Sequence, residues 1–355
     1  MKILFLTPAP RNISPSQRFR FEQYIGLEGF KLNTFTIRSF YSDWAWSVLH
    51  KNGYAFRKTM GILGGFFRRF LTLFTLSAYD FIYIHREAAP IGPPIFEWLI
   101  SKVFRKKIIY DFDDAIWVKI ASDANPNVAN LKCSWKVAKI CSYSKTVSVG
   151  NDFLAQYAEK YCKDVRIIPT VVNTESYHNK LRDQTNGELV IGWTGTFTNL
   201  YNLQLITKVI QKLQSKHNFK FLIIADRDPK LKDLNYTYHK WNLKTEIQDL
   251  LQMHIGIMPL INSEVEKGKC GFKAIQYMSL GIPAVVSPVG ANRNVVEDGV
   301  TGYWAEKDEE WEERLERLIK DEKLRIELGK NGREKIIKAY AVNVQKTNFF
   351  HLFQK

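Results

Sequence analysis

Residues 264–302 read EVEKGKCGFKAIQYMSLGIPAVVSPVGANRNVVEDGVTG. The stretch begins with a loop rich in glycine and lysine. A short amphipathic helix follows, because Phe272, Ile275 and Met278 recur at helical spacing, Gly281 suits a left-handed position after a helix end, and Pro283 prevents continuation. An apolar strand and a second glycine loop complete the stretch. This order of elements predicts an anion-binding loop in an α/β domain.

The lysine-rich loop is the part predicted to bind the anion. Gly268 and Gly271 leave the backbone open, so that N–H groups at the helix start can approach a phosphate closely. Lys267, Lys269 and Lys273 add positive charge to a helix end that is already positive, which is unfavourable unless an anion binds there. A solvated basic loop before an ordinary helix is the alternative interpretation.

The rest of the chain reads as two alternating series of strands and helices, and 355 residues suit about two domains. We expect strands at 2–7, 32–37, 81–85, 107–112, 146–149 and 165–168, and then at 189–193, 219–224, 236–241 and 255–259. We expect helices at 200–216, 245–253 and 309–320, with another to about residue 340. The fold class is therefore α/β, with two doubly wound, Rossmann-like domains and a linker near 173–188.

The 264–302 stretch resembles the donor-binding half of GT-B glycosyltransferases, in particular the retaining enzymes of family 4. In that family a glycine loop, a helix of the form E-A-M-x-x-G-x-P-V, then G-G-x-x-E and D-G-x-x-G bind a nucleotide-sugar. The matching positions here are Met278, Gly281, Pro283, Gly290, Asp298, Gly299 and Gly302. The paired glutamates of the family fall on Gly268 and Gln276, and its later glutamate falls on Asn294.

The resemblance implies two domains that face a cleft, with the last helix crossing back to the first domain. Residues 1–173 with 339–355 would form the acceptor side, and 187–338 the nucleotide-sugar side. It also implies a retaining hexosyltransferase that uses a UDP- or GDP-sugar and a glycan or lipid-linked acceptor in cell-surface polysaccharide synthesis. No cofactor or metal is expected, because the lysine loop would stabilise the departing diphosphate. The missing glutamates leave open a non-catalytic protein that binds sugar nucleotides or glycans.

Several residues of the second domain are candidates for binding the donor. The phosphates are expected at Gly195 and Thr196, after the strand 189–193, and at the loop residues Lys267, Lys269, Gly271 and Lys273. Arg227 is a candidate near the base. Gln276 can bind ribose hydroxyls through its amide, and either Glu264 or Glu266 can supply a carboxylate. The family has an arginine and a lysine after the first strand, which 196–204 lacks, and the loop lysines are predicted to replace them.

Charged residues end two strands of the first domain, where open α/β sheets place ligands. His85 can be a proton shuttle, a ligand of a sugar hydroxyl or a structural histidine. Asp111, Asp113 and Asp114 are more than one helix cap at Ala115 requires, and their repulsion raises some pKa values unless a cation, an arginine or sugar hydroxyls offset it. We predict that His85, Asp113 and Asp114 are catalytic. Asp111 and Arg86 are predicted to bind the acceptor or the diphosphate.

The first loop argues against a dinucleotide-binding site. No glycine lies between Thr7 and Phe21, so the GxGxxG fingerprint is absent. Residues 14–17 read instead as an N-cap serine, a proline at the first helical position and a capping-box glutamine. Arg18 and Arg20 follow, and they either point outward on a surface helix or hold a donor diphosphate or a phosphorylated acceptor.

Residues 56–74 predict a basic, aromatic and amphipathic helix. Arg57 and Arg68 lie together with Lys58 and Arg69 beside them, and the opposite arc has Met60, Leu63, Phe66, Phe67, Phe70 and Phe74. Such a helix suits an anionic membrane interface. Gly61, Gly64 and Gly65 weaken it, and the same arc can pack on the first domain's sheet instead.

Charge and composition narrow the class of partner. The formal net charge is +15, and basic residues exceed acidic ones by 11 in 1–186 and by 4 in 187–355. This field favours anionic lipid, phosphorylated ligands or nucleic acid, but no helix-turn-helix, RNP or zinc pattern supports the last. Cys133, Cys141, Cys162 and Cys270 form no CxxC pair, no apolar run nears the length of a membrane span, and we expect no signal peptide. We expect a cytoplasmic protein, with a peripheral position on the inner face of the cytoplasmic membrane left open.

Overall fold

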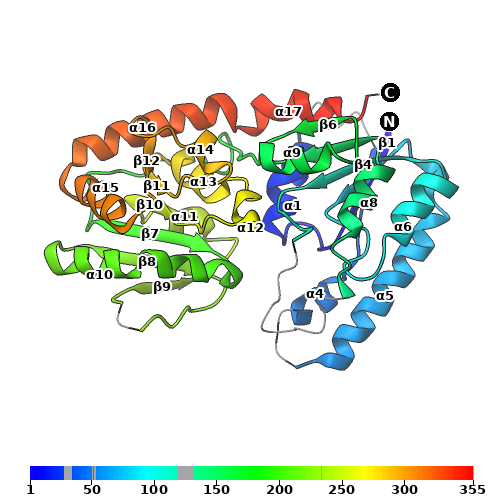
Figure 1. Ribbon diagram of the computed structural model, residues 1–355, viewed down its shortest axis with the longest axis horizontal. Helices are drawn as coiled ribbons and strands as arrows, with labels where there is room; N and C mark the ends of the chain where they lie inside the picture. The colour runs from blue at the N-terminus through cyan, green and yellow to red at the C-terminus, as the bar shows by residue number, and fades with distance from the viewer. Residues whose placement is uncertain (28–33, 50, 52, 119–130, 233, 355) are drawn as a thin grey trace. The chain divides into compact units, whose positions relative to one another are not determined.

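The computed structural model divides the chain into two compact units (Figure 1). The first unit comprises Met1–Thr170 and Lys346–Lys355, and the second comprises Val171–Gln345. The structure describes residues 1–27, 34–49, 51, 53–118, 131–232 and 234–354. The sequence led us to expect the second domain at 187–338, whereas this unit also takes in the segment after Thr170. Arg182 N donates to Leu280 O at 2.8 Å and the Gln184 amide donates to His254 O at 3.1 Å, which attaches that segment to the second unit.

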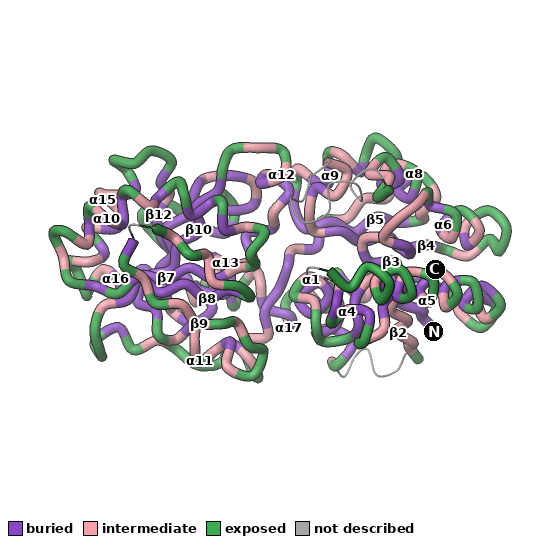
Figure 2. The backbone as a smooth tube through the Cα atoms, turned by 90° about the horizontal axis from the view of Figure 1, so that it is seen from below, coloured by how far each residue is buried: buried purple, intermediate pink, exposed green. Residues whose placement is uncertain are grey.

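The first unit has a six-stranded parallel sheet in the order β2-β1-β3-β4-β5-β6. Its strands are β1 (Lys2–Thr7), β2 (Thr34–Ser39), β3 (Phe81–His85), β4 (Lys107–Phe112), β5 (Thr146–Val149) and β6 (Val165–Ile167). The predicted strand positions are confirmed, although the expected start of β2 at 32–33 lies outside the described residues. All residues of β3 and β5 are buried, as the purple backbone in Figure 2 indicates, because apolar runs in parallel sheets are covered on both faces.

The helices of the first unit are mostly short. They are α1 (Pro15–Gln17), the π-helical turn η1 (Arg18–Glu22), α2 (Gln23–Ile25), α4 (Asp43–Leu49), α5 (Ala55–Leu73), the 3-10 turn η2 (Leu76–Ala78), α6 (Ile95–Trp98), the π-helical turn η3 (Leu99–Val103), α8 (Lys136–Tyr143) and α9 (Asp152–Ala158). Ser14 occupies the N-cap of α1 without a side-chain cap. The predicted capping-box role of Gln17 is wrong, because its amide oxygen accepts from Ala9 N at 2.9 Å and so fixes the first loop.

The second unit also has a six-stranded parallel sheet, in the order β12-β11-β10-β7-β8-β9. Its strands are β7 (Val190–Gly195), β8 (Lys220–Ala225), β9 (Thr237–Lys240), β10 (Ile255–Met258), β11 (Ala284–Val286) and β12 (Gly302–Trp304). Its helical elements are the 3-10 helix η4 (Phe197–Leu205), α10 (Thr207–Lys216), α11 (Glu246–Leu250), α12 (Glu264–Lys267), α13 (Phe272–Ser279), α14 (Asn292–Val295), α15 (Asp308–Lys320) and α16 (Glu322–Ala339). The predicted helix at 200–216 is therefore two elements, since its first part is a 3-10 helix.

Helix α13 ends as the sequence predicts but is more buried than an amphipathic helix. Gly281 has φ +70°, and Gly281 N and Ile282 N donate to Met278 O and Tyr277 O, which is a Schellman motif. Every residue from Ala274 to Ser279 is buried. The predicted solvent face is therefore wrong, because β10, β11, α14 and α16 surround the helix.

The C-terminal helix α17 (Val342–His351) returns the chain to the first unit, as predicted. Phe349 stacks on Tyr24 with 4.3 Å between ring centroids, and Phe353 lies 6.2 Å from Phe5. These aromatic contacts attach the tail to the core around β1 and β3. Within the described residues, no helix combines the length and the apolar character needed to cross a bilayer.

Candidate functional site

In the first unit, the candidate site is built around His85, the last residue of β3. His85 Nδ1 lies 2.9 Å from Asp111 Oδ2, and its Nε2 lies 2.8 Å from Ser16 Oγ at the start of the first helix. Because the ionised Asp111 can only accept, Nδ1 carries a proton. In the neutral ring Ser16 therefore donates to Nε2, and in the imidazolium the direction of that hydrogen bond reverses. Asp111, His85 and Ser16 therefore form a chain of hydrogen bonds along which a proton can pass.

Arg20 is the ion-pair partner of Asp111. Its Nη2 lies 2.5 Å from Asp111 Oδ1 and 3.2 Å from Ser148 Oγ, and its Nη1 donates to the carbonyl of Ile168. Burial alone raises the pKa of Asp111, but the charges of Arg20 and then His85 outweigh it and hold that pKa well below its usual range. Arg20 is 1% exposed and Arg18 is 8% exposed, so the interpretation that both point outward is wrong.

Arg86 holds the other two carboxylates of the cluster. It donates to Asp113 Oδ1 at 2.8 Å and also to Asp114, and its backbone has the left-handed φ of +61°. Burial raises the pKa of Asp113, but the charge of Arg86, the charge of His85 and a hydrogen bond from Ser16 together outweigh it, so the net shift is downward. The predicted repulsion is therefore offset by arginines. The alternative of a cap is wrong, because no helix begins at Ala115 in the described part of that loop.

Ser16 is the residue that the sequence analysis missed in this unit. When His85 is the imidazolium and its Nε2 donates to Ser16, the single hydroxyl proton of Ser16 can be donated to Asp113, which contributes to the low pKa of that carboxyl, so Ser16 connects His85 to the Arg86 pair. The His85–Asp111 pair and the Arg86–Asp113 pair thus belong to one network. The serine of a Ser-Pro-Ser sequence gives no signal by itself, because its partner lies sixty-nine positions along the chain.

In the second unit, Lys269 lies against the turn that follows β7. Its Nζ donates to Asn199 Oδ1 at 2.7 Å, and the Asn199 amide donates to Thr196 Oγ1 at 2.9 Å. The loop 267–273 and the turn that contains Gly195 and Thr196 are therefore brought together, as the sequence predicts for a shared phosphate site. Asn199 is a further residue of this contact that the sequence analysis missed.

Lys273 reaches the same turn from the first turn of α13. Its Nζ lies 5.2 Å from the centroid of the Trp193 ring, and a Cβ built on Gly195 would stand 2.9 Å from Lys273 Cε. Gly195 therefore leaves the space through which the lysine passes. The backbone carbonyl of Lys267 packs against Gly290, since a Cβ on Gly290 would stand 2.6 Å from that oxygen.

Glu266 and Gln276 are both buried beside this loop, with different hydrogen bonding. Glu266 is 0% exposed, accepts from Tyr201 and from the Asn202 amide at 3.3 Å, and lies 3.5 Å from Lys269 Nζ. Gln276 is 3% exposed, and its Nε2 has no acceptor among the described residues. A buried amide without a partner is costly in the folded protein, which suits a group that a ligand satisfies.

Arg227 lies at the carboxyl end of β8, beside the same turn. Its guanidinium lies 4.4 Å from the centroid of the exposed Phe197 ring, and Phe197 N donates to Asp226 Oδ1 at 2.6 Å. The pair offers a flat, cationic and aromatic surface of the kind on which a planar ring can stack. Phe197 is a third residue that the sequence analysis missed.

The two glycine loops of the stretch 264–302 pack directly on each other. Gly271 precedes α13 with φ +68°, and a Cβ there would stand 2.8 Å from Val295 Cγ2 of α14. Gly290 has φ +54° and packs on the carbonyl of Lys267. Both glycines are thus required by backbone conformation and close contact, which fixes the position of the lysine loop.

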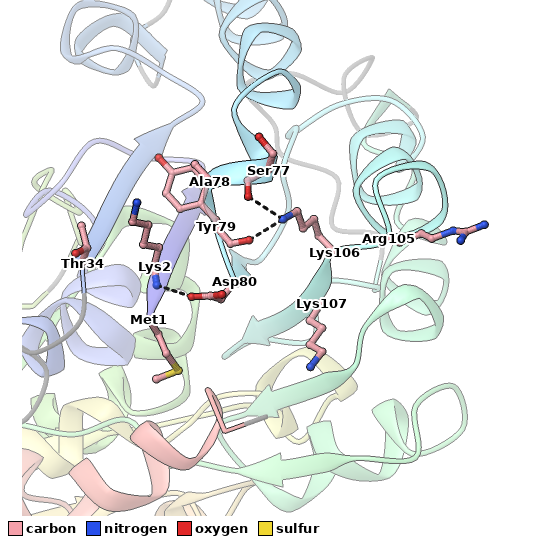
Figure 3. A pocket seen from close by; sticks show the side chains of 10 residues that line it. All are labelled: Met1, Lys2, Thr34, Ser77, Ala78, Tyr79, Asp80, Arg105, Lys106 and Lys107. Atoms are coloured by element: carbon pink, nitrogen blue, oxygen red, sulfur yellow. Dashed lines mark hydrogen bonds between the residues drawn. The ribbon is translucent and has the colours of Figure 1, made fainter.

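A hollow of about 660 Å³ lies elsewhere in the first unit, at the amino ends of β1, β3 and β4 (Figure 3). It includes Lys2, Asp80 and Lys107, each at or next to the start of a strand, and none of the predicted site residues. Because ligands of open α/β sheets bind at the carboxyl ends of the strands, we do not assign the donor or acceptor to this hollow. In the described ranges, no group of three His, Cys, Asp or Glu side chains is placed to hold a metal ion.

Comparisons with known proteins agree with this fold. Residues 188–321 match the family model described as "Glycosyl transferases group 1". The capsular polysaccharide biosynthesis glycosyltransferase CapM of Staphylococcus aureus is 25% identical over 171 residues, which span 46% of this chain and 44% of CapM. The chain thus matches less than half of the length of that relative.

Two solved structures resemble the whole chain. A glycosyltransferase from Rickettsia africae superposes with a TM-score of 0.68 at 14% identity, covering 99% of this chain and 97% of its own. HepE of Anabaena, solved in complex with UDP-glucose, superposes with a TM-score of 0.65 at 14% identity, covering 99% and 98%. The chain therefore has the GT-B fold, and its second unit contains the region similar to group 1 glycosyltransferases.

Proposed function

We propose that this protein is a retaining glycosyltransferase of the family 4 type, which moves a sugar from a nucleoside diphosphate sugar to a glycan or lipid-linked acceptor. The observation that supports this most is the approach of Lys269 and Lys273 to the turn after β7, where the sequence pattern expects a diphosphate. CapM is named for capsular polysaccharide biosynthesis, and the HepE structure contains UDP-glucose, which favours the same class of donor and product.

In this proposal the second unit binds the donor. Lys269 and Lys273 contact the diphosphate, and the positive end of the α13 dipole adds to their charge. As the bond from the anomeric carbon to the phosphate breaks, negative charge grows on the leaving group, and the fixed ammonium groups stabilise it. Glu266 accepts from Tyr201 and Asn202 and lies 3.5 Å from Lys269 Nζ, so we assign it to positioning Lys269 rather than to the ribose.

The nucleoside would lie next to the same loop. The unpartnered Nε2 of Gln276 would donate to a ribose oxygen, which removes the cost of its burial. Arg227 and Phe197 would stack against the base. UDP and GDP both fit these contacts, since neither residue reads the edge of a base.

The first unit would supply an acid–base group and the acceptor contacts. Asp111 orients His85 through Nδ1, so Nε2 is the atom that takes or gives a proton. Asp113 and Asp114, neutralised by Arg86, would accept hydrogen bonds from hydroxyl groups of a sugar. Arg20 acts on Asp111 and not directly on a ligand.

Equilibrium binding of nucleotides to a loop variant tests the proposal. For Lys269→Ala/Lys273→Ala, we expect the affinity for UDP or GDP to fall about tenfold or more, because each lysine removed is a charged hydrogen-bond donor to phosphate. Lys320→Ala/Lys338→Ala removes the same charge from exposed positions and should bind as the wild type does. Equal affinity in both double variants would refute the donor site.

A panel of UDP-, GDP- and ADP-sugars then separates an enzyme from a binding protein. We expect one donor to be hydrolysed or transferred by the wild type and not by His85→Ala. Tight binding of a donor without hydrolysis or transfer to any glycan or lipid-linked acceptor would favour the non-catalytic alternative, which the missing glutamates at Gly268 and Gln276 suggest.

A further inference from the structure

Helix α5 presents a row of large apolar side chains to the surface of the first unit. The side chains recur at spacings of three and four residues, and their exposed fractions lie between 47% and 78%. We call this row the apolar stripe, and its members are Phe56, Met60, Leu63, Phe67, Phe70 and Phe74. The helix has 19 residues, so the stripe is about 28 Å long.

The opposite side of α5 holds the helix in this orientation. A Cβ on Gly61 would stand 2.7 Å from Ala45 Cβ, and one on Gly65 would stand 2.4 Å from the Phe40 ring, so only glycine permits the contact. Arg69, 1% exposed, donates to the carbonyls of Ala88, Arg38 and Thr7 at 2.6, 2.8 and 2.7 Å. Turning the helix to bury the stripe would break these bonds and leave a cation buried without partners.

The sequence allows the apolar stripe either to face outward or to pack on the sheet of the first unit, and the structure therefore shows that it faces outward. Phe66 is the exception, because it packs on Phe40 and on Phe96 of α6, with centroid distances of 5.4 and 5.9 Å. Helix α6 lies beside α5 and adds the exposed Ile95 and Trp98 (Figure 1). In the described part of the chain, no segment covers the stripe, since all six side chains remain at least 47% exposed.

Within the segment that carries the stripe every charged residue is basic, and the exposed Asp43 and Asp80 lie just outside that segment. Residues 44–79 contain no Asp or Glu, and they include Lys51, Arg57, Lys58, Arg68 and Arg69. Arg57 is exposed at the start of α5. At the other end Lys106 Nζ donates to Tyr79 O at 2.8 Å, and Arg105 extends into solvent (Figure 3). Basic side chains thus flank both ends of an apolar surface.

We propose that α5 docks the first unit on an anionic lipid bilayer, with the helix axis parallel to the membrane and the apolar stripe inserted at the level of the headgroups. An apolar stripe buries its area there, and the flanking lysines and arginines are attracted by anionic headgroups. Pairing of two α5 helices from two copies fits less well, because like charges would meet without acidic partners on either helix. The proposal stands whether or not the proposed reaction is correct, because it concerns binding alone.

Vesicle flotation tests the proposal directly. The wild-type protein should float with vesicles of equal parts phosphatidylcholine and phosphatidylglycerol. Phe67→Ser/Phe70→Ser should lower the partition coefficient about tenfold or more, because two apolar side chains no longer leave water. Ile326→Ser/Ile337→Ser removes exposed apolar side chains of the second unit, each 43% exposed, and should float as the wild type does. Phe56→Ser/Met60→Ser is a second pair should the first not fold.

The charge dependence is tested in the same assay. Arg57→Gln/Lys58→Gln should reduce flotation with the anionic vesicles, and pure phosphatidylcholine should bind the wild type more weakly. The proposal would be overturned if the wild-type protein remained at the bottom of the gradient, or if the stripe variants floated as well as the wild type. Sedimentation velocity tests the alternative of a second copy. A wild-type dimer that becomes a monomer in Phe67→Ser/Phe70→Ser, with neither protein binding vesicles, would also overturn the proposal and would assign the stripe to a dimer interface.

Discussion

The candidate sites of the two units differ in how their charged residues are paired. In the first unit, Arg20 pairs with Asp111, and Arg86 pairs with Asp113 and Asp114, so acids and bases neutralise one another. In the second unit, the loop 267–273 has three lysines and no acid, and the ion pair of Lys269 with Glu266 is long, at 3.5 Å. A neutralised cluster stabilises and orients, whereas a positive loop with a buried amide that lacks an acceptor beside it favours an anionic ligand.

A high density of charge in the sequence therefore does not by itself identify a ligand site. Three aspartates in four residues look like a metal or sugar site in the sequence, yet the structure gives each of them an arginine. The lysine loop differs because its three lysines follow one another in the sequence with no acidic residue between them. Removing Asp111, the buried partner of Arg20, should therefore act mainly on stability, and removing Lys269 and Lys273 mainly on binding.

The largest effect is expected from Asp111→Ala. This change leaves Arg20 and His85 buried without their carboxylate, and it should lower the free energy of unfolding by about 3–5 kcal/mol. Urea denaturation measures the loss. Glu313→Ala is the control, because its side chain is 65% exposed and its pair with Arg314 should contribute almost nothing. A loss below about 1 kcal/mol for Asp111→Ala would contradict the stabilising role that we give to the charged network of the first unit.

The next effect separates stability from binding at Gln276. Gln276→Met removes an unpartnered buried amide, so it should raise the stability of the ligand-free protein by about 1 kcal/mol. The same change should weaken binding of UDP or GDP about tenfold. Thermal denaturation with and without nucleotide measures both, and the exposed Gln248→Met is the control. Loss of stability together with unchanged binding would show that the amide has a partner within the protein.

The smallest effect is a difference in pH dependence between the units. Burial, followed by the charge of Arg182, lowers the pKa of His254 from 6.5 to about 4, and His254 Nδ1 accepts from Val190 N at 3.0 Å. A depressed pKa gives stability above pH 6.5 that is lost as the pH falls towards 4. The pKa values of Asp111 and Asp113 are also lowered, so their contribution is lost only below about pH 4, the usual range of an aspartate.

His254→Gln tests this difference. Glutamine can still accept from Val190 N but does not titrate, so the loss of stability between pH 6.5 and 4 should shrink by on the order of 1 kcal/mol. Urea midpoints measured across that range for wild type and variant give the answer. Parallel curves for the two proteins would mean that His254 is not responsible.

Much of the fold could be predicted because local patterns determine it. Apolar runs such as those of β3 and β4 have one stable position, inside a parallel sheet, and Gly281 with Pro283 ends α13 as expected. The lysine loop could be predicted because it is continuous in the sequence. Burial of α13 and the split of 200–216 could not, because they depend on packing with distant elements.

The residues missed at the candidate site have one property in common. Ser16, Asn199 and Phe197 act through partners that are distant in the chain, namely His85, Lys269 and Arg227. The sequence leaves the orientation of α5 open for a related reason, since its helical periodicity places the phenylalanines on one side but does not determine which side packs. The contacts of Gly61, Gly65 and Arg69 decide it.

The most direct measurement of the central claim is a crystal of the protein soaked with UDP or GDP. We predict that density for the diphosphate lies between the loop 267–273 and the turn at Gly195–Thr196, with Lys269 and Lys273 in contact and the ribose near Gln276. Diphosphate density at another place in the second unit, or density only in the hollow at the amino ends of β1, β3 and β4, would contradict it.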